Sequence, residues 1–178
     1  EATRLLLASN DVDSIRVADI ADSAGCSTAT IHNHFPNALP DILAAISEDI
    51  IQTAFKQFEK ISKDFSGIEL VRSYFKTVGE HISEQADVAV PSIAISVDLA
   101  SQGSWFDRKI FSDCKELFKT AKETEQINGS HDQLASLTHT FFQGALYSWA
   151  LGSITSEEFL RMSTESVDFA VSSCRGAP

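Results

Sequence analysis

Apolar side chains recur every three or four residues between positions 42 and 61, and this spacing constrains the fold more than any other feature. The periodicity matches one face of a helix about five turns long. Similar spacing continues to the end of the chain, whereas residues 88–90 form the only short β-like run. The sequence therefore predicts an all-α protein. The residues of this first stripe are Ile42, Ile46, Ile50, Ala54, Phe58 and Ile61.

Turn and capping residues divide the pattern into nine predicted helices. The first ends near residues 9–11. The second runs from about 15 to 23 with Ser14 as its expected N-cap. Gly25 separates it from a third, which Ser27 is expected to cap and which ends near 34. Pro40 suits the first turn of the long fourth helix. The remaining helices are expected to begin at Gly67, at Pro91 (ending at Gly103), near Phe106, near His131, and after Thr155 or Ser156.

Composition limits the class of protein. The chain has 178 residues, of which 43% are hydrophobic, and this suffices for one sizeable core or for a small domain beside a larger one. No apolar run is long enough to span a bilayer. The three cysteines, Cys26, Cys114 and Cys174, are widely spaced and indicate neither a disulfide framework nor a metal site. We therefore expect a cytoplasmic protein without membrane contact. Residues 1–5 already have helical character, so the natural N-terminus is expected upstream.

The segment from residue 17 to residue 35 has the features of a helix-turn-helix. This motif crosses two short helices through a tight turn so that the second helix can enter the major groove of DNA. Here Ala24 and Gly25 supply the turn, and the small side chain of Ala21 allows close crossing. Ile31 and Phe35 return to the core. The segment therefore predicts a DNA-binding head.

Two stretches resemble the TetR family of transcriptional regulators. Residues 17–37, VADIADSAGCSTATIHNHFPN, are similar to the family's DNA-binding head, and residues 140–160, TFFQGALYSWALGSITSEEFL, to its last two helices. The resemblance implies nine helices in two domains. The first, called the head here, is a three-helix DNA-binding domain over residues 1–47. The second, called the body, is a ligand-binding and dimerisation domain over residues 48–178.

The resemblance also implies which residues contact DNA. Polar side chains on and before the second motif helix can hydrogen-bond to phosphates or base edges. The family usually has Tyr where His32 stands, and Lys where Ala38 or Leu39 stands, so the recognition helix is divergent. The alternative for any one residue is that it caps or decorates a helix. The candidates are Arg16, Ser27, Thr28, Thr30, His32, Asn33 and His34.

The charge of the head opposes this assignment. The whole chain carries a formal net charge of −11, and residues 1–47 hold two arginines against six acidic residues. DNA affinity comes largely from Lys and Arg on phosphates. The alternative function is therefore a TetR-like dimer that has lost DNA binding and serves as a ligand-binding or protein-interaction module.

Aromatic residues on several body helices, with polar residues among them, predict a site for a small, mostly apolar effector. Such sites are apolar cavities with a few placed polar groups, and a buried polar group needs a partner. The alternative is that these residues form an ordinary core. The candidates are Phe58, Tyr74, His81, Trp105, Phe111, His139, Phe142 and Gln143.

The ninth predicted helix is apolar around much of its girth and must be covered on more than one side. The resemblance implies that the last two helices of two subunits form a four-helix bundle, giving a homodimer that binds a roughly palindromic, double-stranded operator. The alternative is that they close the core of one chain. The interface candidates are Leu146, Trp149, Phe159, Ser163, Ser166 and Ala170.

The sequence holds no HExxH, GxSxG or glycine-rich phosphate motif. His32 and His34 are two residues apart and point to different sides of a helix, so they cannot chelate a metal together. We predict no enzyme, cofactor or metal. The predicted function is a repressor that an unknown small molecule, bound in the body, releases from DNA.

Overall fold

The computed structural model describes residues 1–7, 9–10, 14–98 and 105–174; for 94–98 and 105–108 it describes the backbone only. Over these residues the chain forms nine α-helices and a short 3-10 helix, with no strand. This confirms the predicted all-α class. The helices are α1 (Ala2–Leu7), α2 (Val17–Ala24), α3 (Thr28–His34), α4 (Leu39–Ile61), α5 (Gly67–Glu84), α6 (Ala86–Asp98), α7 (Trp105–Thr124), α8 (His131–Ala150) and α9 (Ser156–Ser173), with η2 (Ser62–Asp64) after α4.

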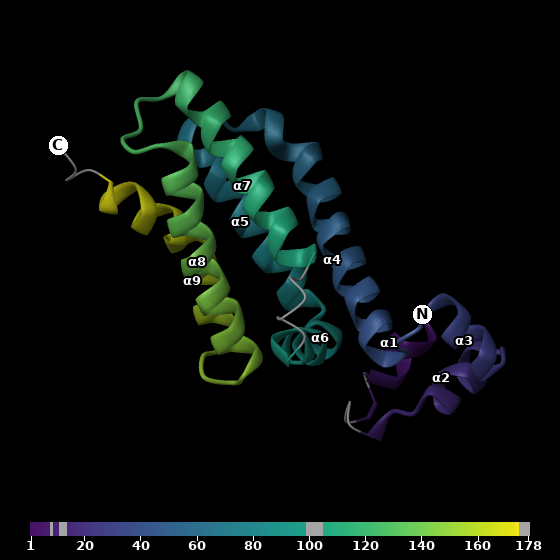
Figure 1. The fold of residues 1–178 in the computed structure, drawn as a ribbon. Helices are drawn as coiled ribbons and strands as arrows, with labels where there is room; N and C mark the ends of the chain where they lie inside the picture. The colour runs from purple at the N-terminus through teal and green to yellow at the C-terminus, as the bar shows by residue number, and fades with distance from the viewer. Residues whose placement is uncertain (8, 11–13, 99–104, 175–178) are drawn as a thin grey trace.

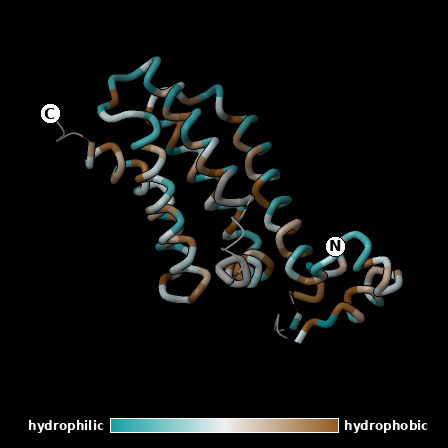
Figure 2. The backbone as a smooth tube through the Cα atoms, in the orientation of Figure 1, coloured by the Kyte–Doolittle hydropathy of each residue, from teal (hydrophilic) through white to brown (hydrophobic). Residues whose placement is uncertain are grey.

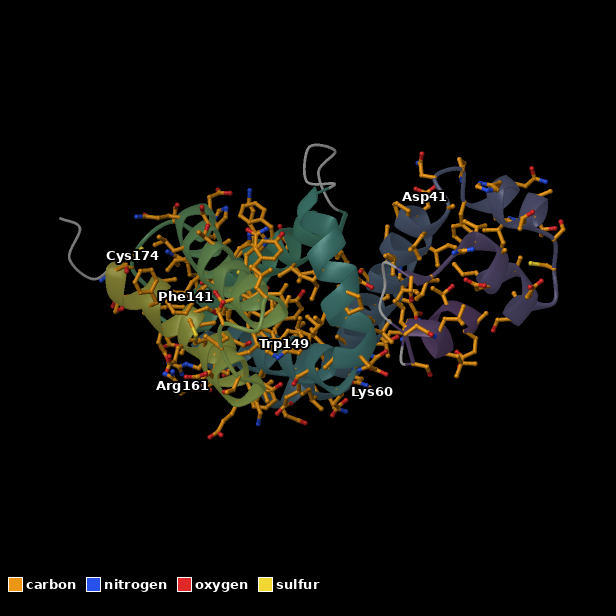
Figure 3. All side chains as sticks on the ribbon, turned by 90° about the horizontal axis from the view of Figure 1, so that it is seen from below. Asp41, Lys60, Phe141, Trp149, Arg161 and Cys174 are labelled. Carbon is orange, nitrogen blue, oxygen red and sulfur yellow. The ribbon has the colours of Figure 1, made fainter. Side chains whose placement is uncertain are left out.

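The helices form two groups joined by α4 (Figure 1). Helices α1 to α3 gather around the first turns of α4. Helices α5 and α7 pack against α4, and α8 and α9 lie on the far side of α5 and α7. Helix α6 lies at the base of the body beside α4 and α8. In Figure 3, Asp41 marks the head end of the molecule and Cys174 the opposite end. The predicted boundary between head and body, after residue 47, falls inside α4. Because one continuous helix belongs to both parts, this boundary stays a prediction.

The predicted stripe of α4 faces the core. Ile42, Ile50, Ala54 and Phe58 are each at most 6% exposed, and hydrophobic residues alternate with hydrophilic ones along the tube of Figure 2. Ile61, expected to end the stripe, is 38% exposed because α4 passes into η2 there. Each fully buried side chain of this size contributes about 1.5–3 kcal/mol to folding.

Local capping explains the start of α2 and α3. Ser27 caps α3 as predicted, since its Oγ accepts a hydrogen bond from the Thr30 backbone at 3.1 Å. Gly25 ends α2 with a left-handed φ of 66°. The prediction that Ser14 caps α2 is wrong. The cap is Arg16, whose backbone N–H donates to Asp19 Oδ2 at 2.9 Å, so the helix begins two residues later than expected.

The predicted start of the sixth helix is also wrong. Helix α6 begins at Ala86, and Pro91 lies inside it. Proline in a helix interior removes one backbone hydrogen bond, a cost that tertiary packing can offset. Here Val88 and Ala89, in the turn before the proline, are 5% and 2% exposed. The expected end at Gly103 lies outside the described residues. Among the described residues no helix is both long enough and apolar enough to cross a membrane.

Candidate functional site

Helices α2 and α3 pack against each other through their inward faces and leave one face of α3 open. Ile20 and Ala21 on α2 are each 2% exposed, and Ile31 on α3 is 8% exposed. The predicted contact residues lie on the outer side, and the protein's own body does not cover them. Arg16, Ser27, Thr28, Thr30, His32, Asn33 and His34 are all exposed.

Two of these side chains already have partners. Ser27 Oγ accepts from the Thr30 backbone, and the two hydroxyl oxygens lie 2.9 Å apart at hydrogen-bond distance. Ser27 therefore performs the capping role that was the alternative to DNA contact. A hydroxyl has one donor and two acceptor positions, so this pair keeps one donor and two acceptor positions for other groups.

Acidic groups and one engaged arginine shape the electrostatics of the head. Asp22 is exposed and Asp41 is half-buried, and Asp41 Oδ2 accepts from the Asn37 backbone at 2.8 Å. Arg4 Nη2 donates to Asp49 at 2.8 Å, so this guanidinium is directed toward the body. Arg16 is the remaining arginine of the head, and it is exposed. The geometry of the head suits a groove, but its charge is unfavourable for phosphates.

Arg4 also begins a hydrogen-bonded chain that joins head and body. Its Nη1 donates to Gln85 Oε1 at 2.5 Å, and Gln85 Nε2 lies 2.8 Å from His81 Nε2. His81, predicted to contact a ligand, is 8% exposed and lies at this contact. Burial lowers the pKa of His81 from its ordinary value of 6.5. Sequence reasoning missed Arg4 and Gln85, because 81 positions separate them.

A row of aromatic rings crosses the body. The centroids are 5.2 Å apart for Phe58 and Tyr74, 5.1 Å for Phe75 and Phe142, and 5.9 Å for Phe142 and Phe159. The first two pairs meet edge to face, an arrangement worth about 0.5–1.5 kcal/mol beyond burial. Three of the ligand candidates, Phe58, Tyr74 and Phe142, therefore contact other rings and have at most 3% of their surface exposed.

A second group of candidates lies between α7 and α8. The Phe111 ring lies 5.6 Å from the His139 ring, and Gln143 Nε2 donates to Tyr147 Oη at 3.3 Å. Phe111, His139 and Gln143 are partly buried. The side chain of Trp105 lies outside the described residues.

A polar cluster joins α5 and α7. Tyr74 Oη donates to Asp113 Oδ2 at 3.0 Å, and the same carboxylate is paired with Lys109, whose Nζ lies 4.2 Å from the centre of the Phe55 ring. Burial, and next the Asp113 carboxylate, raise the pKa of Tyr74 well above its usual value. Tyr74 is therefore a neutral hydrogen-bond donor at physiological pH.

Two cavities lie elsewhere. One of about 620 Å³ lies between α1 and the inner faces of α2, α3 and α4 and is lined in part by Ile20, Ile31 and Ile46. Another of about 350 Å³ lies between α5 and α9 and includes Arg72 and Asp168. None of the predicted ligand residues lines either of these two cavities, so the ligand site stays a prediction.

The six predicted interface residues lie inside one chain. Leu146, Trp149, Phe159, Ser163, Ser166 and Ala170 are all buried. A Cβ atom at Gly79 of α5 would lie 2.8 Å from Ser163 Oγ, which shows how closely α5 and α9 approach. In this arrangement the six side chains close the core of one chain. This is the alternative that the sequence analysis gave to a subunit interface.

The outer face of α8 and α9 carries apolar residues that the sequence analysis did not select. The rings of Phe141 and Phe169 lie 5.2 Å apart, and Phe169 is 46% exposed. Leu151, after the end of α8, is 71% exposed. The signal was present in the sequence, since helical spacing places Phe141 on another side of α8 than Phe142.

The fold is shared with solved structures of transcriptional regulators. No family model matches the sequence, and no curated protein matches it. FadR of Thermus thermophilus, a TetR-family repressor solved with lauroyl-CoA, superposes with a TM-score of 0.73 at 14% identity, covering 93% of this chain and 89% of that one. A TetR transcriptional regulator from Rhodococcus sp. gives 0.71 at 14% identity, covering 96% and 91%. The chain therefore has the TetR fold, as the sequence resemblance implied.

Proposed function

We propose that this chain is a DNA-binding transcriptional regulator of the TetR family that acts as a homodimer and is released from its operator by a small ligand. One observation carries the proposal: in this fold, α3 exposes its polar face while Ile31 anchors the opposite face. A short helix presented in this way is what the major groove accepts.

Contacts in the groove are proposed for the exposed polar side chains of α3. Thr28, His32, Asn33 and His34 can reach base edges or phosphates, and Arg16 at the start of α2 can bind a phosphate. Ser27 and Thr30 order the start of α3, and their two hydroxyls keep one donor and two acceptor positions for DNA. Because the head has only two arginines and no lysine, we expect its affinity for DNA to fall less steeply with salt concentration than that of a basic head.

For the second subunit we propose the outer face of α8 and α9. Phe141 and Phe169, whose rings lie 5.2 Å apart, and the 71% exposed Leu151 beyond the end of α8 replace the six buried residues in this proposal. Exposed apolar side chains favour association with another surface. A two-fold axis through this face would place two heads on successive major grooves, about 34 Å apart.

The body is proposed to bind a small, mostly apolar molecule near α7 and α8. Phe111, His139 and Gln143 are partly buried and combine apolar with polar groups, and the similar structure of FadR was solved with an acyl thioester. Ligand binding must favour a state with altered head spacing, a coupling of typically about 1–3 kcal/mol. We propose regulation and no catalysis.

The second candidate function is a dimer that has lost DNA binding. The exposed Asp22 and the half-buried Asp41, together with the engagement of Arg4 by the body, favour it. Such a protein would keep the dimer and the ligand site.

Footprinting on genomic fragments at two salt concentrations tests the proposal. We expect a protected site of two half-sites, and Arg16→Ala should weaken binding at it several-fold. Lys60→Ala is the matched control, because it removes the same charge from an exposed position on the body. Equal losses in both variants, or no protected site at either salt concentration, would favour the second candidate.

A further inference from the structure

The chain of hydrogen bonds from Arg4 to His81 connects three parts of the molecule. Arg4 on α1 bonds Asp49 of α4 and Gln85, which lies between α5 and α6. Gln85 in turn bonds His81 of α5. Arg4 is 21% exposed and His81 8%, so the inner part of the chain is shielded from water.

The chemistry of these groups fixes the protonation state of His81. A guanidinium has only donors, so the Gln85 atom that faces Arg4 must be the carbonyl oxygen. The amide nitrogen of Gln85 therefore faces His81 and donates to Nε2. An imidazole nitrogen that accepts a hydrogen bond carries no proton. His81 is thus neutral in this arrangement, with its proton on Nδ1.

The second ring nitrogen supports this assignment. Nδ1 is buried and makes no hydrogen bond, while Glu84 Oε2 lies 3.8 Å away. The neutral ring therefore leaves one donor unsatisfied beside a carboxylate. Protonation of the ring would strengthen the attraction of this pair.

Protonation would break the chain at Gln85. A proton from solvent added to Nε2 turns the acceptor into a donor, which then faces the NH₂ donor of Gln85. Rotation of the amide by 180° satisfies His81 but turns the NH₂ group toward Arg4. One carbonyl oxygen cannot serve both groups, because they lie at opposite ends of the amide.

We propose that the Arg4–Gln85–His81 chain is a protonation switch that holds α1 on the body while His81 is neutral and releases it when His81 is charged. The regulatory consequence rests on the proposed function, since a released head would lose the spacing needed for an operator. The switch itself does not require DNA.

The charges around His81 set the pH range. Burial lowers its pKa below 6.5, Glu84 raises it, Arg4 of α1 lowers it and Asp49 of α4 raises it. Asp87, in the first turn of α6, is exposed. The unfolded chain therefore gains this proton at higher pH than the folded chain. The contribution of His81 to folding is complete above pH 6.5 and is lost as pH falls through the lower, folded pKa.

Hydrogen exchange of the full-length protein tests the switch. We expect the protection of the amides of residues 5–7, corrected for the intrinsic effect of pH, to fall about tenfold between pH 7.5 and pH 5, the factor for one lost hydrogen bond to a charged group. His81→Gln, which keeps an uncharged amide at this position, should stay protected at both pH values. Gln85→Leu should be poorly protected at both.

His131→Gln is the matched control, because His131 lies on α8 away from this contact and is 39% exposed. It should behave as the unsubstituted protein does. If His81→Gln loses protection at low pH as the unsubstituted protein does, or if Gln85→Leu remains protected, the switch is wrong. Operator binding at pH 7.5 is measured separately, so a protein that switches but never binds DNA would contradict only the proposed function.

Discussion

Head and body are stabilised in different ways, although both are helical. The body contains the row of buried rings from Phe58 to Phe159. The head relies on a few aliphatic side chains such as Ile20 and Ile31, on caps and turns, and on polar contacts to the body. Since buried area provides most of the stability of a fold, we expect the body to unfold last and the head to open locally. The proposed regulation needs this difference, because the part that changes position must open at a lower free energy than the part that binds the ligand.

The largest expected effect comes from the row of rings. Phe142 is 1% exposed and contacts both Phe75 and Phe159. Phe142→Ala should lower the free energy of unfolding by about 3–5 kcal/mol in urea titrations. Phe65→Ala, at a 39% exposed position after η2 and outside the proposed dimer face, is the control and should cost far less. Similar losses in both would contradict a body held together by its internal rings.

A second test probes the contact between α5 and α9. A Cβ atom at Gly79 would lie 2.8 Å from Ser163 Oγ and 3.1 Å from Ser163 Cβ. Gly79→Ala should therefore cost about 1–3 kcal/mol of unfolding free energy through overpacking. Adding Ser163→Ala removes the nearer atom and should recover part of the loss. If the double variant is no more stable than Gly79→Ala, the close approach is not the cause.

Two equivalent caps allow head and body to be compared directly. Ser27 caps α3 and Thr155 caps α9, each by accepting a backbone hydrogen bond. Loss of such a cap costs about 1 kcal/mol. Thr155→Ala should lower the global unfolding free energy by that amount. Ser27→Ala should appear mainly as faster hydrogen exchange in α3, with little change in global unfolding. Equal global effects would show that head and body unfold as one unit.

The smallest expected effect concerns surface ion pairs within the body. Arg161 and Glu165 are one turn apart on α9 and both exposed by more than 40%. Arg161→Ala should change the unfolding free energy by less than about 0.5 kcal/mol, measured by urea titration. A larger loss would indicate that α9 depends on charge more than on its buried side.

Features set by neighbouring residues were predictable from the sequence. The helical period, the Ser27 cap and the turn at Gly25 each depend on a few adjacent positions, and the structure has all three. The start of α2 was predicted wrongly at Ser14, because Asp19 accepts from the Arg16 backbone and makes Arg16 the cap. The start of α6 was predicted wrongly at Pro91, because tertiary packing tolerates this proline inside the helix. Periodicity identifies an apolar face but not the neighbour that covers it. Residues such as Ser163 were therefore assigned to a partner subunit although α5 covers them.

Contacts between residues far apart in sequence gave no signal at all. Arg4 and Gln85 have no shared pattern in the chain, and a polar residue at a helix start is usually a surface residue. The chain from Arg4 to His81 became visible only when the fold placed α1 beside the middle of α4 and the last turn of α5.

The continuity of α4 has a mechanical consequence. Its 23 residues span about 34 Å without a linker, so the angular position of the head is tied to the winding of this helix. One residue inserted near its middle would turn the head by about 100° about the helix axis, whereas seven residues, close to two full turns, would nearly restore its orientation. Insertions or deletions in α4 that keep the orientation of the head are therefore those close to whole helical turns.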